Sequence, residues 1–280
     1  MDNEKCMDKA KARVLLLYLL NELNRVCETA GIPCYASGGT CLGAIRHGGF
    51  IPWDDDIDYM MPREYYDLFV DTCAKVLKKP VVIRTRENDD YFVQEYIKLC
   101  FEDDELGYSD VSIDVFFLDE TNPNRKVFRF FQNKVLIDLY FTKLYKVSKM
   151  GKGDNYAPHN PLRRIFFGLL SNMSIETINK LHKKTMTAEK SKGEYYINWG
   201  SCYSYKKATY AKNILGTPQK AKFENTYVYI AEKPEQILTQ LYGPNYMTPP
   251  PEDKRTDHGI RDINCSALDF EAVKKEVGEF

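Results

Sequence analysis

The sequence predicts a mixed α/β fold of the α+β type: a sheet core with flanking helices, a basic helical insertion and an irregular C-terminal lobe. Three observations predict it. Helical and strand-like hydrophobic periods alternate over residues 1–120, basic residues concentrate in residues 121–192, and regular periods become rare after that. The chain has 280 residues, 44% of them hydrophobic and 28% charged, which is ordinary for a globular protein.

The first 120 residues supply the elements of the predicted core. Residues 8–30 carry leucines at helical spacing, and a Gly-Ile-Pro segment ends the run. Residues 32–36 are expected to form a short strand, Ser37-Gly38-Gly39-Thr40 a turn, and residues 41–46 a second helix that ends at two glycines. The remaining elements are expected, in order, as strand 57–61, helix 63–77, and strands 81–84, 96–101 and 112–117.

The distribution of charge divides the chain into three predicted domains. Residues 1–120, the catalytic core, contain 24 acidic and 13 basic residues, whereas residues 121–192, a basic helical subdomain, contain 4 acidic and 15 basic ones. Residues 193–280 are nearly balanced and are expected to form a C-terminal lobe that completes the active site. Because acidic clusters collect metal ions and basic ones collect phosphates or anionic lipid, the blocks predict different partners.

The basic subdomain is expected to be helical at 125–149 and 161–192. It mixes lysine and arginine with aromatic and aliphatic side chains at 125–149 and 163–170. Helices with a basic face and an apolar face can lie in a membrane interface, which predicts peripheral contact with an anionic membrane. The same pattern also fits a helical subdomain that packs its apolar face inward and leaves its lysines in solvent. No nucleic acid partner is expected, because the acidic first block would repel it.

The cysteines and the N-terminal segment bear on location. None of the eight cysteines forms a C-x-x-C pair, so neither a zinc site nor a disulfide framework is expected, and buried thiols in a reducing compartment are. The first apolar run, residues 14–20, is far shorter than the roughly 20 residues that span a bilayer, and no signal-peptide pattern precedes it. We expect a cytoplasmic protein, peripheral on the inner leaflet if the basic helices bind membrane.

A cluster of carboxylates is the strongest chemical signal. Asp54, Asp55, Asp56 and Asp58 lie within five positions and repel one another unless a cation sits among them. Strand alternation places Asp56 and Asp58 on one face, and an adjacent strand would place Asp114 about 5 Å away. Three carboxylates suit Mg²⁺ or Mn²⁺, which hold phosphates and stabilise developing charge. A solvated acidic loop is the alternative, but the apolar residues that follow indicate a buried strand.

The glycine turn is the predicted phosphate site. Backbone N–H groups of Ser37, Gly38, Gly39 and Thr40, at the start of a helix, can point at an anion. Four basic residues could also bind a donor phosphate, and each fits a surface or terminal cation equally well: Arg46, His47, Arg255 and His258. Trp53 offers an aromatic face for a quaternary ammonium such as choline, although the tyrosine content selects no substrate.

The segment from Gly38 to Asp58, Gly-Gly-Thr-Cys-Leu-Gly-Ala-Ile-Arg-His-Gly-Gly-Phe-Ile-Pro-Trp-Asp-Asp-Asp-Ile-Asp, resembles the signature of the LicD family. That family includes bacterial phosphocholine transferases and, more distantly, fukutin-related ribitol-phosphate transferases. The resemblance spans roughly residues 37–258 and continues at Ile113–Asp119, at Phe223-Glu224-Asn225, at Leu241–Glu252, and at Arg255 and His258.

The resemblance implies a nucleotidyltransferase-type fold, a metal on Asp56 and Asp58 with Asp114 as the third acid, and release of CMP from a CDP-alcohol donor such as CDP-choline. It implies a glycan or lipid-linked glycan acceptor, as in lipopolysaccharide, teichoic acid or capsule. Choline, ribitol and glycerol all remain open as the alcohol. Cys41 and Phe117 stand where Leu and Pro are usual, and both are expected beside the site, where they would alter substrate shape.

Two other functions fit the same residues. A true nucleotidyltransferase would add a nucleotide to a small hydroxyl compound with the same metal site, and differs only in which product keeps the nucleoside. A pseudoenzyme would bind nucleotide or glycan without turnover, and the presence of all three acids argues against it. The favoured prediction is a metal-dependent transfer of a phosphoryl-alcohol group, with phosphocholine first.

Overall fold

A mixed sheet organises the described part of the chain, which comprises residues 7–89, 92, 94–105, 107–121, 174–187, 193–255 and 268–279 of the computed structural model. The strands run in the order β1-β2-β5-β4-β3, with β6 paired to β5 and β7 to β6. Their bounds are β1 Tyr35–Ala36, β2 Ile57–Pro62, β3 Val81–Arg84, β4 Ile97–Asp103, β5 Gly107–Thr121, β6 Tyr195–Asn198 and β7 Thr209–Ala211.

Strand β5 is the axis of this sheet. It pairs in parallel with β2 over 57–62 and 113–118, and antiparallel with β4 and, at its far end, with β6. β5 is 15 residues long, so it carries a β4 partner near its start and a β6 partner near its end. The parallel register sets Asp58 opposite Asp114.

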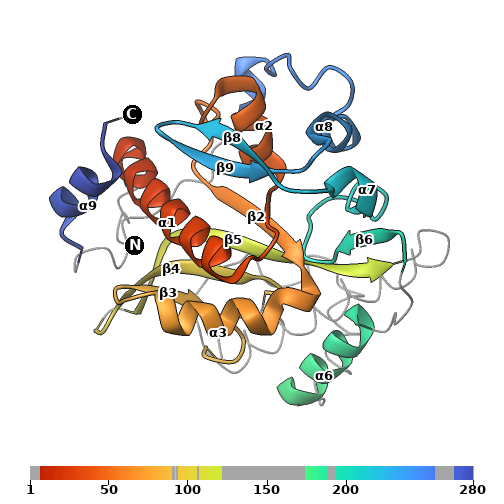
Figure 1. Ribbon diagram of the computed structural model, residues 1–280, viewed down its shortest axis with the longest axis horizontal. Helices are drawn as coiled ribbons and strands as arrows, with labels where there is room; N and C mark the ends of the chain where they lie inside the picture. Colours follow the sequence, from red (N-terminus) through yellow and green to blue (C-terminus); the bar gives the residue numbers. More distant parts are fainter. Residues whose placement is uncertain are drawn as a thin grey trace.

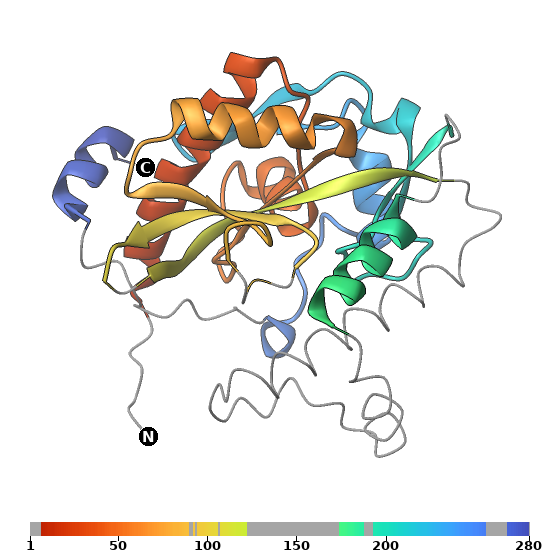
Figure 2. The same ribbon diagram turned by 90° about the horizontal axis from the view of Figure 1, so that it is seen from below.

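Helices cover both sides of the sheet. Figure 1 shows α1 and α3 in front of the strands, and Figure 2 shows α3 and α6 on opposite sides. The bounds are α1 Lys9–Ala30, α2 Gly38–His47, α3 Tyr66–Val76 after the 3₁₀ turn η1 Arg63–Tyr65, α6 Ile175–Met186, α7 Lys212–Leu215, α8 Pro234–Tyr242, the 3₁₀ turn η3 Glu252–Lys254 and α9 Phe270–Val277.

Helix α1 is the centre of the main core. The Asp8 side chain caps it by accepting from Ala10 N–H at 2.7 Å, and Gly31 ends it in the left-handed conformation. Leucines at almost every turn are fully buried because α3, α9, the sheet and a C-terminal hairpin surround the helix. Burial on several faces explains why the helix is more apolar than an amphipathic surface helix.

The hairpin of β8, Gln219–Phe223, and β9, Thr226–Ile230, braces the segment that leads to the acidic cluster. Glu224 in its turn has a positive φ of 54°; its N–H donates to the Gly48 carbonyl at 2.8 Å and its carboxylate accepts from Phe50 N–H at 2.9 Å. The C-terminal lobe thus holds the loop that follows α2.

Most of the elements expected in residues 1–120 are confirmed, and two expectations are wrong. Ser37 to Thr40 is no separate turn, because extended Ser37 and left-handed Gly38 let α2 begin at once. Residues 193–255 are not irregular, because β6 and β7 extend the main sheet and β8 and β9 form a hairpin. Each of these strands has only three to five residues, which is too short for a clear period in the sequence.

The helix predicted at 125–149 and the first part of the one predicted at 161–192 lie outside the described residues, whereas α6 confirms helix in the later part of residues 161–192. Within the described ranges, no helix is both long enough and apolar enough to cross a membrane. The three-domain division stays a prediction.

We predict that Gly43→Ala destabilises the fold by about 1–3 kcal/mol, the usual cost of overpacking. A methyl group there would lie 2.5 Å from the Gly49 carbonyl oxygen and 3.4 Å from Ile51 N, both backbone atoms that cannot rotate away. Thermal unfolding measures the loss. Gly39→Ala is the matched control and should cost less, because its methyl meets the Asp54 side chain, which can turn. Equal effects of the two changes would contradict the packing argument.

Candidate active site

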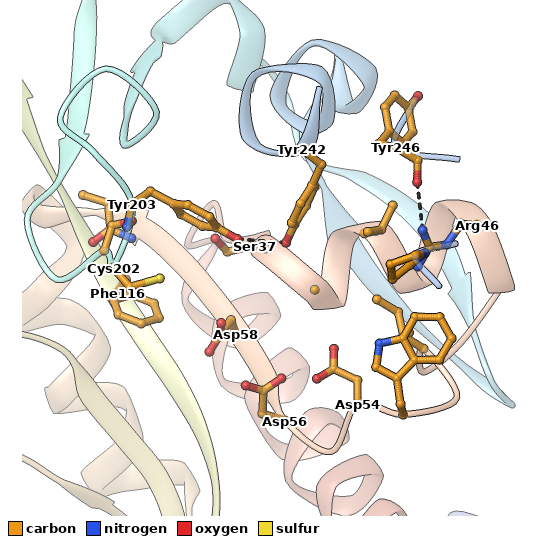
Figure 3. A pocket seen from close by; sticks show the side chains of 18 of the residues that line it. Ser37, Arg46, Asp54, Asp56, Asp58, Phe116, Cys202, Tyr203, Tyr242 and Tyr246 are labelled. Atoms are coloured by element: carbon orange, nitrogen blue, oxygen red, sulfur yellow. Dashed lines mark hydrogen bonds between the residues drawn. The ribbon is translucent and has the colours of Figure 1, made fainter. Parts of the chain in front are cut away.

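A cavity of about 550 Å³ opens where the start of α2 meets the segment that leads into β2. Its lining comes from residues 37–58, Phe116 on β5, the β6–β7 connection, and α8 with the segment that follows it. In Figure 3, Asp54, Asp56 and Asp58 lie along one wall, and Tyr242 projects from α8 across from them. The N-terminal core and the C-terminal lobe therefore share one cavity.

Backbone contacts fix the start of α2 against β2. Ser37 N–H donates to the Asp58 carbonyl at 2.8 Å, and the buried Thr40 hydroxyl accepts from Asp58 N–H at 2.9 Å. Gly38 has a φ of 50°, where glycine is favoured, and a Cβ on Gly39 would lie 2.5 Å from an Asp54 oxygen. The glycines let a helix N-terminus, with its free N–H groups, approach the carboxylates closely.

A clamp from α1 holds the segment that carries the acids. Arg13 donates through one terminal nitrogen to the carbonyl oxygens of Ile51, Pro52 and Asp54, at 2.9, 3.1 and 3.0 Å. Its guanidinium also lies 5.0 Å from the Phe50 ring centroid. The clamp joins two distant parts of the sequence, so periodicity and spacing gave no signal for it.

The carboxylates at the cavity create a strongly negative environment. Burial raises the pKa of the Asp58 carboxyl well above its usual range, and the charges of Asp56, Asp114 and Asp54 raise it further, while Lys98 lowers it. Like charges in a dry site disfavour ionisation. The cluster therefore favours a cation close to Asp58.

Asp114 lies in register with Asp58 on β2, but its carboxylate is bonded to a residue of the strand on the other side of β5, which is β4. Lys98, its partner across the β4–β5 pairing, donates to Asp114 Oδ1 at 2.8 Å and to Ser112 Oγ at 2.9 Å. Burial, together with the charge of Asp114 and a hydrogen bond to it, raises the pKa of Tyr96. Lys98 was missed by sequence reasoning, since a lone lysine in a strand carries no pattern.

These residues fit a divalent cation in chemistry and charge without forming a finished coordination site. Carboxylate oxygens are the ligands that Mg²⁺ and Mn²⁺ prefer, and Asp56 and Asp58 line the same cavity. Over the described residues, however, no three His, Cys, Asp or Glu side chains converge closely enough to hold a metal ion. A metal site here would need Asp56, Asp58 and Asp114 to turn toward a common point.

One end of the cavity, where Arg46 and Trp53 lie, is cationic, and we call it the far end. Arg46 donates to the Tyr246 carbonyl at 2.8 Å and lies 5.9 Å from the Trp53 ring centroid, while the Arg255 guanidinium lies 4.5 Å from the same centroid. His47 meets the Trp53 ring edge-on at 6.4 Å. Two guanidinium groups beside one indole make this end suitable for anions and planar rings, and unsuitable for a second cation.

The structure distributes the predicted site residues unevenly. Ser37, Gly38, Gly39 and Arg46 line the cavity with Asp56 and Asp58. The other predicted residues that the structure describes do not line it but lie next to Asp58 or Trp53, which do: Thr40, His47, Asp114 and Arg255. His258 lies outside the described residues.

Cys41 and Phe117 do not affect substrate shape directly, contrary to expectation. Both are buried away from the cavity lining, and Phe117 packs on the Tyr66 ring at 4.9 Å between centroids. Strand alternation turns Phe116 to the cavity and Phe117 to the core, so the neighbour of the unusual residue is the one that matters.

Sequence reasoning also missed the aromatic residues at the opposite end of the cavity, which we call the near end. Tyr203 and Tyr242 line the cavity, and the Tyr203 hydroxyl donates to the Tyr242 hydroxyl at 3.1 Å. Tyr242 lies in the Leu-Tyr-Gly-Pro segment that marked the resemblance, which was a usable signal; Tyr203 lies in a Tyr-rich stretch with none. Asp54, too, lines the cavity, whereas Asp55 is 2% exposed and does not.

Comparison with known proteins relates this chain to one family. The family described as "LicD/FKTN/FKRP, nucleotidyltransferase domain" matches residues 31–132, a range that contains β1 through β5. The lipopolysaccharide cholinephosphotransferase LicD of Haemophilus influenzae is 27% identical over 258 residues, which cover 89% of this chain and 95% of that protein. The chain is therefore similar to a LicD-type phosphotransferase over most of its length.

More distant LicD relatives share only a short segment. The ribitol 5-phosphate transferase FKRP of mouse and that of human are each 54% identical over 33 residues, 12% of this chain and 7% of theirs. The similarity to the Haemophilus LicD extends well beyond the family domain, so it includes parts of the C-terminal lobe that line the cavity.

We predict that Asp58→Asn stabilises the metal-free protein at neutral pH. A carboxyl whose folded pKa is raised contributes stability below its ordinary value of 3.8 and loses it as pH rises through the folded pKa. The variant has no such loss, so its advantage should be large at pH 7 and shrink toward pH 4. Thermal unfolding in chelator measures it, with exposed Asp71→Asn on α3 as control. A less stable variant at pH 7 would mean that the charge is already compensated.

Proposed function

We propose that this chain transfers phosphocholine from a CDP-activated donor to a hydroxyl group of lipopolysaccharide or a related cell-surface glycan, with a divalent cation. The observation that carries the proposal is the shared cavity: a helix N-terminus opened by two glycines faces three carboxylates. The substrate class is supported by the Haemophilus cholinephosphotransferase, whose similarity extends over most of both chains. We further infer a nucleotidyltransferase-type sheet, in keeping with the description of the matching family.

The acidic residues, the backbone N–H groups and the basic residues of the site have different proposed roles. Asp56, Asp58 and, after a side-chain rotation, Asp114 would hold Mg²⁺ or Mn²⁺, which would bind the donor phosphates and stabilise the charge that develops there. The N–H groups of Gly38 and Gly39 bind a phosphate oxygen at the start of α2. Arg46, Trp53 and Arg255 take the nucleotide, with the guanidinium groups toward its phosphate.

The reaction is an in-line displacement at the phosphorus that bears choline. The acceptor oxygen forms a bond to this phosphorus, the bond from phosphorus to the CMP oxygen breaks, and CMP leaves with that electron pair. The acceptor proton passes to a carboxylate, for which Asp114 is the proposed acceptor.

The acceptor and its membrane remain part of the proposal. An acceptor that is built on a lipid would be presented at the inner leaflet, and the basic residues at 125–149 are proposed to dock the enzyme there by charge. That stretch lies outside the described residues, so this step rests on the sequence pattern alone.

Nucleotide fate tests the reaction. With CDP-choline labelled in its methyl groups, lipopolysaccharide and Mg²⁺, we predict label on the glycan and one CMP for each label transferred. Chelation of the metal should stop both. Appearance of the cytidine on the acceptor, with free phosphocholine left behind, would instead establish the nucleotidyltransferase alternative, and tight CDP-choline binding with neither product would establish a pseudoenzyme.

The roles of the acidic residues should be distinguishable in the same transfer assay. We predict that Asp56→Ala abolishes transfer and that Asp114→Asn, which keeps size and loses charge, lowers it by at least about a hundredfold, the scale of general-base contributions. Exposed Asp71→Asn, on α3 away from the cavity lining, is the matched control and should leave turnover unchanged. Turnover near the wild-type rate in Asp114→Asn would demote Asp114 to a structural partner of Lys98.

A further inference from the structure

The two ends of the cavity differ in charge and in aromatic content, and this difference suits a substrate whose own two ends differ. Figure 3 shows Arg46 and Tyr246 at one end, Tyr203 and Phe116 at the other, and the carboxylates between them. Among the lining residues that the structure describes, Arg46 is the sole cation. A CDP-alcohol has the same asymmetry when its alcohol is a quaternary ammonium, because a nucleotide at one end is anionic and planar and the head at the other is cationic.

The near end is rich in aromatic rings, whose faces are electron-rich. The rings of Tyr203 and Tyr242 meet edge to face at 6.2 Å between centroids, and Phe116 is backed by the Tyr96 ring at 4.5 Å. Aromatic faces attract cations, best where water is excluded. The Tyr203 ring already has a cation beside it, because Lys207 Nζ lies 5.9 Å from its centroid. Among the described residues, no cation makes such a contact with the Tyr242 ring.

A buried acceptor atom marks the same end as a binding site. Asn198, at the end of β6, is only 4% exposed and lines the cavity, yet its amide oxygen has no hydrogen-bond partner among the described residues. Buried polar atoms without a partner are rare in native proteins and call for a ligand or a water. An unpaired carbonyl oxygen suits the polarised C–H groups of a trimethylammonium head, and equally a hydroxyl of a polyol.

The electrostatic field at this end favours the cation. Burial raises the pKa values of both Tyr203 and Tyr242, and the carboxylates Asp54 and Asp58 add to each shift, so their charges reach the two hydroxyls, which stay protonated. Tyr242 lies close to the reaction centre, because a Cβ on Gly38 would be 3.7 Å from both its hydroxyl and an Asp58 oxygen. A head group on Tyr242 would therefore sit one phosphate away from the carboxylates.

We propose that Tyr203, Tyr242, Phe116 and Asn198 form the site for the quaternary ammonium head of the transferred group, at the end of the cavity opposite the nucleotide. Trp53, which the sequence offered for this role, suits it less well because two guanidinium groups already lie beside its ring, against one lysine beside Tyr203 and no cation beside Tyr242 among the described residues. The assignment rests on the proposed function, since it presupposes a CDP-alcohol donor. It adds the orientation of that donor and the residues that select choline.

The test compares two donors that differ only in charge: CDP-choline and CDP-3,3-dimethylbutanol, in which carbon replaces the nitrogen. Isothermal titration calorimetry with Mg²⁺ and without acceptor should show roughly tenfold tighter binding of CDP-choline to the wild-type chain, the scale of a partly desolvated cation–π contact. Tyr242→Leu and Tyr203→Leu should bring this ratio toward one with unchanged affinity for CMP, and Tyr242→Phe should keep it. Thermal unfolding checks that each variant is folded.

The matched control is Tyr246→Leu, an aromatic residue of the same cavity at the cationic end, which should keep the preference for the charged donor. A ratio of one in the wild type, tighter binding of CDP-ribitol than of CDP-choline, or a ratio that survives in Tyr242→Leu and Tyr203→Leu would overturn the assignment. Failure of the proposed function is read separately, as absence of label transfer by the wild-type chain. Transfer with an unchanged ratio in the leucine variants would refute only the head-group site.

Discussion

The parallel pairing of β2 with β5 is the constraint on which the site depends. Its register sets Asp58 beside Asp114, and the segment before β2 adds Asp54 and Asp56. Such a cluster of acids repels itself, and the backbone ladder with the buried core behind it must hold it together. Lys98 on β4 compensates part of this negative charge through its ion pair with Asp114. The raised pKa of Asp58 indicates that repulsion among the acids persists at the cavity, which is where the substrate would bind.

Contacts from three other elements keep that repulsion from moving the acids. Arg13 on α1 fixes the carbonyl groups before them, Glu224 in the β8–β9 turn fixes the loop after α2, and Thr40 fixes the start of β2. All three bonds reach backbone atoms, so they set the path of the chain without holding the carboxylate groups themselves. The described acids do not converge on one point, so a shared metal ion would require their side chains to turn.

The sequence predicts local and repetitive features well and long-range contacts poorly. Helix 8–30 and the strands through residue 117 follow from hydrophobic period, and the Asp-rich segment followed from charge density. Even the partnership of Asp58 and Asp114 was accessible, since both are acids in strands. Lys98, Arg13 and Tyr203 were not accessible, because each acts through a partner far along the chain. The short strands β6 and β7 depend on β5 for their pairing and carry too little pattern of their own.

The two ends of the cavity suit the two ends of a CDP-alcohol donor. The guanidinium groups beside Trp53 are each held by a backbone carbonyl, Arg46 by that of Tyr246 and Arg255 by that of Pro250, which fixes their charge for an anion. The aromatic end lies on the other side of the carboxylates, where one tyrosine positions the other. A donor bound across the cavity would have its nucleotide beside the guanidinium groups, and only a head that tolerates aromatic faces and an unpaired carbonyl would complete the fit. Selection of the alcohol would then occur next to the bond that breaks, where discrimination affects turnover as well as binding.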